Sequence, residues 1–484
     1  MRAIVAVLKR KGNNAAEKAL AMLESLKHKG ANAFGLASTS DLEVKPSPEL
    51  LEAQSLRGCT VVGQAFVKIM PLDRPQLFML ERAAMVFDGR VYSPPEPIDW
   101  NTVIGSKREP RWTEITEAII KMFEGSFAFA IADDEGLIVG RDPLGLYPLY
   151  YGGNEETFAA ASECKALWKI GLKEVKSFPP GHIAIIDKKS QTIREVKLLR
   201  GYGKINLDLN EAAGALATLL ERSTRERTQG LDEVAVAFSG GLDSSLIALL
   251  VKRAGLNAHF IHVSLEGQPE TDQARKAADL LGMPLHVYLY KEEDVEQSLP
   301  KVLWAIESSD PTKAAIGIPI FWAAERAAEM GFKVLLAGQG ADELFGGYMR
   351  YLNAYLQHGE EYAQRKILDD IEHMYENNFE RDFKICSFHN VELRLPFAAS
   401  PLVEFALKLP LRLKIEPRYG FRKAVLRKAA ETAGMPAQIA NAPKKAVQYA
   451  TGVSRALRRL AKKNNMPLRK YLENVFLTLQ WNGR

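Results

Sequence analysis

The chain has 484 residues, 47% hydrophobic and 25% charged, which is a globular composition in a chain too long for one ordinary core. Its formal net charge of +5 is mildly basic and does not by itself call for a nucleic-acid partner. The three cysteines lie far apart without a CxxC pair, which argues against a zinc ribbon and a disulfide framework. The first apolar run, AIVAVL, is too short and wrongly flanked for a signal peptide or membrane span, so we expect a cytoplasmic protein that contacts no membrane.

The first part of the chain is predicted to be rich in strands, with helices inserted. Residues 15–28 carry apolar side chains at helical spacing. Residues 125–142 are typical of a hairpin with DDEG at its turn, and residues 178–196 are typical of a second strand–turn–strand unit. We therefore expect a domain at 1–200, followed by a linker near 200–211.

The pattern changes in the second part, where short apolar runs alternate with helical stretches. Such alternation predicts a parallel sheet covered on both faces by helices, in a domain at 205–484. Beyond residue 345 the chain is predicted to be mostly helical and increasingly basic. The expected strands are 233–238, 258–265, 285–290 and 333–338, and the expected helices are 243–255, 270–282, 292–307 and 316–330.

The stretch AFSGGLDSS, residues 237–245, follows the first of these strands and opens a helix. Ligands of open parallel sheets bind beyond the carboxyl ends of the strands. Glycines let backbone N–H groups turn toward an anion, and a helix N-terminus adds a favourable dipole. Phosphate is therefore the expected ligand, although neither GxxxxGK[ST] nor GxGxxG is present.

Acidic residues in the same region point to a metal ion. Asp243 lies inside the expected phosphate loop. Its carboxylate would repel a bound phosphate unless a cation, usually Mg²⁺, lay between them. A second loop, GQGADELFGGY at 338–348, follows the fourth strand and supplies Asp342 and Glu343. Two acidic loops at one edge of a sheet predict a shared Mg²⁺ site.

Basic residues downstream are less informative by themselves. FRKAVLRKAA places Lys423 and Arg427 four residues apart, on one helix face. APKKAVQYATG adds Lys444 and Lys445. Lysines on helices are usually solvated, so these residues gain weight only from the similarity described next.

These motifs, together with VELRLPF at 391–397, resemble the synthetase domain of the asparagine synthetases and β-lactam synthetase. The amino-terminal half resembles the glutaminase half of the same enzymes through FAFAI, RDPLG, ASECKAL and PPGH. The resemblance implies an Ntn-hydrolase-like β-sandwich with helices, followed by a parallel-sheet ATP pyrophosphatase domain of the adenine nucleotide α-hydrolase type. It also implies an AMP-forming ligase that adenylates a carboxylate with ATP and Mg²⁺ and passes the acyl group to an amine.

The resemblance also implies roles for particular residues. Asp243 and Asp342 match the Mg²⁺–pyrophosphate ligands. The candidate catalytic residues are Lys423, near the phosphates; Lys444, preferred over Lys445; and Glu392, a proton acceptor or relay. Gln339 stands where relatives carry an acid or a tyrosine, which leaves that role open. The residues matched to ATP binding are Ala237, Ser239, Gly240, Gly241, Leu242, Asp243, Ser244, Ser245, Val263, Ala337 and Gly338.

The amino-terminal half departs from the family's glutaminase pattern in four places. Residue 2 is Arg2 instead of the nucleophilic cysteine, and no cysteine precedes Cys59. Asp88 replaces the oxyanion-hole asparagine, and a carboxylate repels an oxyanion. The arginine expected to bind glutamine is missing from QAFVKIM, and SPPEPIDWN replaces an SDTE-like segment. We therefore expect an inactive glutaminase domain and an enzyme that uses ammonia.

The favoured interpretation is an ammonia-dependent asparagine synthetase, or a related amide or lactam ligase with another carboxylate or amine. A homodimer is considered as the assembly. A tRNA-modifying ATP pyrophosphatase is a second hypothesis, because SGGxDS occurs there and RALRRLAKKNN at 455–465 is basic, but nucleic acid is not expected without a catalytic cysteine pair. A catalytically silent regulatory protein is a third, against which the intact SGGLDSS, Asp342 and Lys444 argue.

Overall fold

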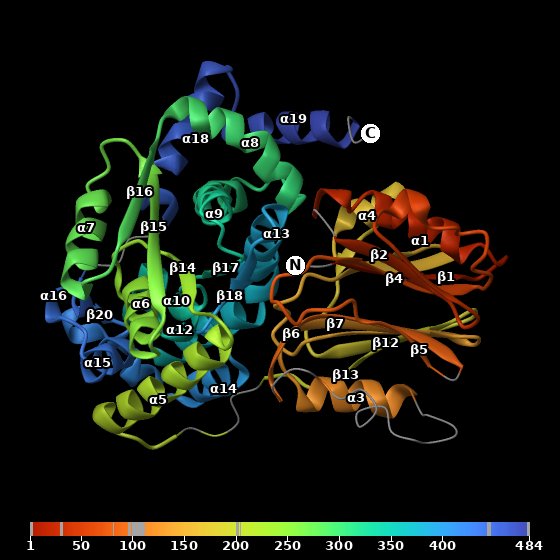
Figure 1. The fold of residues 1–484 in the computed structure, drawn as a ribbon. Coiled ribbons are helices and arrows are strands. Elements are labelled where there is room, and N and C mark those ends of the chain that lie inside the picture. The colour runs from red at the N-terminus through yellow and green to blue at the C-terminus, as the bar shows by residue number, and fades with distance from the viewer. Residues whose placement is uncertain are drawn as a thin grey trace. The chain divides into compact units, whose positions relative to one another are not determined.

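The computed structural model describes residues 3–29, 32–80, 82–94, 98, 112–199, 203, 205–442 and 447–481. The chain divides into two compact units, Met1–Leu199 and Arg200–Arg484 (Figure 1). Within the described ranges, no helix combines the length and apolar character that a membrane crossing requires. Arg2, Lys444 and Lys445 lie outside the described residues.

The amino-terminal unit contains two antiparallel sheets. As far as the described residues go, their strand orders are β11-β9-β10-β1-β4-β2-β3 and β13-β12-β8-β7-β6-β5. The strands of the first sheet are β1 (Ala3–Lys9), β2 (Ala33–Ala37), β3 (Leu42–Lys45), β4 (Thr60–Phe66), β9 (Tyr150–Gly153), β10 (Thr157–Ala161) and β11 (Lys176–Ser177). Those of the second are β5 (Leu77–Leu80), β6 (Ala83–Ser93), β7 (Glu124–Asp133), β8 (Gly136–Arg141), β12 (His182–Asp187) and β13 (Gln191–Glu195).

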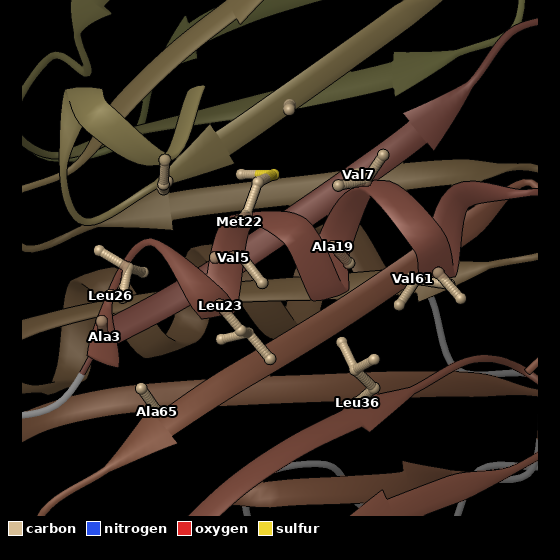
Figure 2. Packing of buried hydrophobic residues seen from close by; sticks show 14 of the residues in the cluster. Ala3, Val5, Val7, Ala19, Met22, Leu23, Leu26, Leu36, Val61 and Ala65 are labelled. Atoms are coloured by element: carbon tan, nitrogen blue, oxygen red, sulfur yellow. The ribbon is translucent and has the colours of Figure 1, made fainter. Parts of the chain in front are cut away.

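Alternation of side chains along β1 explains how these layers stack. All of β1 is buried, and successive side chains of a strand point to opposite faces. Odd-numbered residues pack under α1 (Ala15–Glu24), as Val5 and Val7 do in Figure 2, while even-numbered residues such as Ile4 pack into the core shared with the second sheet. The outer face of the second sheet is covered by α3 (Trp112–Met122), and α4 (Cys164–Lys169) packs beside α1. The predicted β-sandwich with helices is therefore confirmed.

The carboxyl-terminal unit contains a parallel sheet. Its strands, in spatial order, are β16 (Leu285–Tyr290), β15 (Asn257–Leu265), β14 (Glu233–Ala237), β17 (Val334–Leu336) and β18 (Glu392–Arg394). Four of these confirm the predicted strands, and β18 was not predicted. The chain builds the sheet outward from β14 to β16 and then returns to add β17 on the other side of β14. The strand order therefore reverses between β14 and β17, which is the position where ligands of such sheets bind.

Helices cover both faces of this sheet, because crossovers between parallel strands are right-handed and the reversal moves later helices to the opposite face. Accordingly, α6 and α9 both contact β14 and β15, and Figure 1 shows them on opposite faces. The helices of this unit are α5 (Leu209–Thr228), α6 (Leu242–Arg253), α7 (Glu270–Leu281), α8 (Glu292–Ile306), α9 (Pro311–Glu329), α10 (Ala341–Leu344), α11 (Met349–His358), α12 (Glu360–Glu372), α13 (Glu380–Phe388), α14 (Ser400–Lys408), α15 (Ala424–Thr432), α16 (Ala437–Ala440), α17 (Val447–Ala450), α18 (Val453–Lys463) and α19 (Leu468–Trp481).

One helix boundary corrects the sequence prediction. The predicted helix at 316–330 begins earlier, at Pro311, because the Asp310 side chain accepts a hydrogen bond from the Lys313 N–H and caps the first turn. Proline at the first helical position is well suited to such a start. The Asp310–Pro311 pair carried this information in the sequence.

Candidate active site

The candidate site lies at the carboxyl end of the parallel sheet, where the strand order reverses. The SGGLDSS loop follows β14, and the GQGADELFGGY loop follows β17, its spatial neighbour. Segments about a hundred residues apart in sequence therefore meet at one edge, as the alternating pattern predicts.

The SGGLDSS loop is folded so that its glycines meet other backbone closely. Gly240 has φ +70°, and a Cβ there would lie 2.6 Å from Ala274 Cα, so only glycine fits. Gly241 caps α6, and Ser244 Oγ accepts a hydrogen bond from the Ser239 N–H at 3.2 Å. The loop thus presents the N-terminus of α6, whose first N–H groups have no partner within the helix.

The second loop packs directly on the first. A Cβ on Gly338 would lie 2.9 Å from Asp243 Cβ. After Gly340 the chain turns into α10, which carries Asp342 and Glu343 in its first turn. The two loops therefore support each other through backbone that has no room for a side chain at Gly338.

One lysine joins the two predicted metal ligands. Lys423 Nζ lies 2.7 Å from both carboxylate oxygens of Asp243 and 2.7 Å from Asp342 Oδ1. The lysine side chain is only 2% exposed, and each aspartate is 14% exposed. Lys423 has a left-handed backbone, with φ +61°. Three segments distant in sequence thus form one compact ionic cluster.

This cluster also tests whether Mg²⁺ fits here. Among the described residues, no group of three or more His, Cys, Asp or Glu side chains could hold a metal ion by itself. Mg²⁺ usually takes one or two carboxylates and completes its shell with water and substrate phosphates. Asp243 and Asp342 already converge on one cation, the Lys423 ammonium, so the donor set fits an ion that arrives with a nucleotide.

The two loops open into a cavity of about 610 Å³. The predicted nucleotide and metal residues that line it are Ala237, Ser239, Asp243, Ser244, Val263, Ala337, Gly338 and Asp342. The remaining loop residues, Gly240, Gly241, Leu242 and Ser245, belong to the same turn without lining the cavity. Gln339 also lines it.

Glu392 lies elsewhere. On β18 the side chain of Leu393 lines the cavity, and its neighbours along the strand point the other way. Glu392 Oε1 accepts a hydrogen bond from Arg394 Nε at 2.6 Å, and Arg394 also donates to the Arg227 carbonyl oxygen. The structure therefore pairs Glu392 with Arg394 and does not bring it to the cavity wall.

Sequence reasoning missed a group of charged side chains that line the cavity, which we call the charged end. They are Asp310, Lys313, Arg350, Asp370, Arg381 and Asp382. Arg381 Nε lies 2.6 Å from Asp382 Oδ1 in a fully buried pair, and Arg350 Nη2 lies 2.8 Å from Asp370 Oδ2. Burial and the nearby Lys384 charge lower the pKa of Lys313. These residues come from α9 and its cap, α11, α12 and α13, so no single sequence motif contains them.

Glu343, which follows the predicted metal ligand Asp342 in sequence, is the centre of a hydrogen-bonded network. Glu343 Oε1 accepts hydrogen bonds from Tyr348 Oη and Asn378 Nδ2, both at 2.7 Å. Burial, reinforced by the Asp342 charge, raises the pKa of Glu343. Burial and the same two acids raise the pKa of Tyr348, so its hydroxyl remains a donor. All three side chains line the cavity.

The predicted catalytic lysine, Lys444, and its neighbour Lys445 fall outside the described residues. The chain resumes at α17, and Val447, Gln448, Ala450 and Thr451 line the cavity. The following helix, α18, buries its apolar face and carries the basic residues of the RALRRLAKKNN stretch; Arg459 pairs with Glu292 on α8.

In the amino-terminal unit, Asp88 lies on β6 and is fully buried. It accepts a hydrogen bond from the Tyr147 hydroxyl, which also lies 3.3 Å from Ser162 Oγ. Gln64, the first residue of QAFVKIM, donates to the Phe87 carbonyl oxygen. Arg2 and most of SPPEPIDWN are outside the described residues.

Comparison with known proteins agrees with this geometry. The family described as asparagine synthase matches residues 215–362 and 355–478, and the glutamine amidotransferase domain family matches residues 78–169. The chain belongs to the asparagine synthase family. It is 32% identical to “Putative asparagine synthetase (glutamine-hydrolyzing) 1” of Methanocaldococcus jannaschii over 93% of each chain. Membership of the asparagine synthase family makes this protein an ATP-dependent carbon–nitrogen ligase that forms AMP.

Other members of the asparagine synthase family match over a shorter span. The asparagine synthetase (glutamine-hydrolyzing) 2 of Arabidopsis thaliana is 30% identical over 66% of this chain, which corresponds to 57% of the plant protein. Among solved structures, NMN synthetase from Francisella tularensis has a TM-score of 0.28 at 11% identity, covering 57% of this chain and 92% of that one. The assignment to the family rests on sequence alone.

Proposed function

We propose that this chain is an ammonia-dependent asparagine synthetase. The observation that supports the proposal most is the convergence of a phosphate-type loop and two acids on a single cavity at the strand reversal, with one buried lysine bridging the acids. In this proposal the amino-terminal domain, 1–200, is an inactive relative of a glutaminase, and residues 205–484 carry the synthetase.

The first half-reaction activates the carboxylate. A carboxylate oxygen attacks the α-phosphorus of ATP, the bond from that phosphorus to the bridging oxygen breaks, and pyrophosphate leaves with the electron pair. The N-terminus of α6 and Lys423 hold the phosphates. Asp243 and Asp342 would hold Mg²⁺, which supplies charge screening for the leaving pyrophosphate.

The second half-reaction forms the amide. Ammonia attacks the acyl carbon, and the tetrahedral intermediate collapses as the bond to the AMP oxygen breaks. Lys444 stabilises the oxyanion in this proposal, supported by the cavity-lining residues that follow it. Glu343 lines the cavity and has a raised pKa, so it is a better-placed proton acceptor than Glu392, which is paired with Arg394.

Aspartate is the carboxylate that the charged end of the cavity suits best. Positive charge comes from Lys313, Arg350 and Arg381, and negative charge comes from Asp310, Asp370 and Asp382. Opposite charges at one end of a pocket match the carboxylate and ammonium groups of an amino acid.

Ammonia is the proposed nitrogen source because residues on which the family's glutaminase reaction depends are replaced in this chain. Arg2 stays protonated at physiological pH and offers no nucleophile. Asp88 would repel a glutamine-derived oxyanion, and it is buried against Tyr147.

The decisive experiment measures pyrophosphate release and amide formation with ATP, Mg²⁺ and a panel of carboxylates and amines. We expect aspartate with ammonium to react, faster as pH rises toward the ammonium pKa, and glutamine to be inert. Glutamate release from glutamine by pure protein would contradict the ammonia proposal. Reaction only with an organic or intramolecular amine would instead identify an amide or lactam ligase.

Lys444 and Lys445 form a natural matched pair for the second step. Lys444→Met is expected to slow amide formation by about 10²–10³, the usual cost of one lost oxyanion donor, with little change in ATP binding. Lys445→Met is the control and should remain close to wild type. The reverse result would assign the role to Lys445.

A further inference from the structure

The position of the Lys423 ammonium raises a question about how a metal ion enters the site. The ammonium contacts three carboxylate oxygens, two of Asp243 and one of Asp342, each at 2.7 Å. A divalent ion held by both aspartates would need the same oxygens. The lysine therefore occupies the space between the two acids that the ion would take.

The lysine is closely packed in this position. Its backbone has φ +61° and ψ +36°, a left-handed conformation that residues other than glycine rarely adopt. A Cβ on Gly347 would lie 2.3 Å from Lys423 Cε and 2.0 Å from Asp342 Oδ1, so both groups pack directly on the loop backbone. Only 2% of the lysine side chain is exposed.

Counting charges shows what a metal ion would do here. Asp243, Asp342 and Lys423 together carry one negative charge, because two carboxylates face one ammonium, and the Arg427 guanidinium adds a further positive charge that interacts with Asp243. A divalent ion added alone would leave an uncompensated positive charge in a largely buried cluster, which is unfavourable. A triphosphate supplies about four negative charges and makes room for both cations, consistent with the preference of Mg²⁺ for substrate phosphates.

We propose that Lys423 is the resident cation of the metal site in the nucleotide-free protein, and that a divalent ion binds there only together with the nucleotide, whose phosphates draw the ammonium away from the acids. The inference rests on the proposed function, in which Asp243 and Asp342 hold the Mg²⁺ of ATP. Lys423 then acts first as a counter-ion that keeps two acidic loops together and afterwards as a phosphate ligand.

Mn²⁺ is a suitable probe, because free Mn²⁺ gives a paramagnetic resonance signal that bound Mn²⁺ loses. Without nucleotide, wild-type protein should bind no Mn²⁺ at this site, so the signal of free Mn²⁺ should stay unchanged. With a non-hydrolysable ATP analogue, a ternary complex with one Mn²⁺ per chain should form. Lys423→Met should bind one Mn²⁺ per chain without nucleotide, at least about tenfold more tightly than wild type.

Two variants control the experiment. Lys428→Met removes a partly exposed lysine from α15, the helix that begins after Lys423, and should behave like wild type. Lys423→Met combined with Asp243→Asn should lose the new Mn²⁺ site. If Lys423→Met is unstable because its two acids repel, Mn²⁺ should restore its Tm without raising the wild-type Tm, since an ion that binds the folded state stabilises it.

Either of two results would overturn the inference. One is nucleotide-free wild-type protein that binds one Mn²⁺ per chain and loses it in Asp342→Asn. The other is Lys423→Met that neither binds Mn²⁺ nor gains Tm from it. Pyrophosphate release by wild-type protein is measured separately, so failure of the proposed function is distinguishable from failure of this inference.

Discussion

Two buried ionic clusters, one in each unit, differ in what surrounds them. In the amino-terminal unit, Glu163 lies 2.6 Å from Lys165 Nζ, 3.0 Å from Lys29 Nζ and 3.0 Å from His28 Nε2, with its own side chain 1% exposed. In the carboxyl-terminal unit, Lys423 joins Asp243 and Asp342, and both acids line a cavity of about 610 Å³.

The comparison separates two uses of buried charge. Burial alone would raise the pKa of Glu163, but attraction by Lys165, Lys29 and His28 outweighs it and holds that pKa well below the usual range. This cluster, called the closed cluster because the side chains of Glu163 and Lys29 are almost fully buried, stabilises its own unit. The Lys423 cluster opens onto a cavity, so its charges can be redistributed when phosphates arrive. Access to a cavity, more than burial, marks the functional cluster.

The largest expected effect comes from the open cluster. Asp243→Asn removes one of two carboxylates that would hold Mg²⁺, so pyrophosphate release should fall by at least about 10³, since such an ion contributes several kcal/mol. The Tm should hardly change, because Lys423 keeps Asp342 as a partner. Asp279→Asn, on the exposed surface of α7, is the control. Wild-type pyrophosphate release in Asp243→Asn would refute this use of the cluster.

The closed cluster should give the opposite phenotype. Glu163→Gln leaves Lys29 and Lys165 buried without their counter-charge, which should lower the free energy of unfolding by about 3–5 kcal/mol. Pyrophosphate release of the folded variant should be unchanged. Urea unfolding measures the loss, and the largely exposed Glu156 provides a mild control through Glu156→Gln. A loss of activity without a loss of stability would undo the distinction.

Close packing around the open cluster gives a third prediction. Gly347→Ala adds a Cβ that would meet Asp342 Oδ1 at 2.0 Å and Lys423 Cε at 2.3 Å. Displacement of these groups by about 1 Å should cost about 10² in rate. The control is Gly214→Ala, in the interior of α5, where a new Cβ would meet no atom within 4 Å. It should keep full activity and be slightly more stable. Steady-state pyrophosphate release distinguishes them; equal rates would mean that the loop yields.

The smallest effect concerns Lys414, where burial alone lowers the pKa to about 7. In the unfolded chain a lysine titrates near 10.4, so between these pH values only the unfolded state binds the proton, and stability rises with pH. Lys414→Met should therefore raise the Tm by at least about 2 °C at pH 6 and by almost nothing at pH 10. A gain independent of pH would show that the lysine charge is not the cause.

The two strand-end loops of the site could be predicted from sequence better than the charged residues that line the rest of the cavity. SGGLDSS and GQGADELFGGY are continuous motifs, and the strand order brings them together, so Asp243 and Asp342 could be paired in advance. Strand β18 is only three residues long and was missed, and its alternation turns Glu392 toward Arg394. A resemblance of motifs could not reveal which face of that strand meets the cavity.

The charged end of the cavity could not be predicted, because tertiary packing brings its residues together. Lys313 lies on α9 and Arg381 on α13, two helices that pack together although the residues are far apart in sequence. Neither residue belongs to a recognisable pattern. The capping pair Asp310–Pro311 was visible, but its meaning as a helix start became clear only in the structure.

The division of the cavity between strand-end loops and helices has an evolutionary consequence. The residues proposed to bind phosphate lie on crowded backbone, where a Cβ at Gly338 or Gly347 would clash with its neighbours, whereas the charged residues of the cavity project from helices. A helix accepts a new side chain on its surface without altering the course of its backbone. Selection could therefore replace Lys313 or Arg350 and change the charge that lines the cavity, while the backbone of the two strand-end loops stayed as it is.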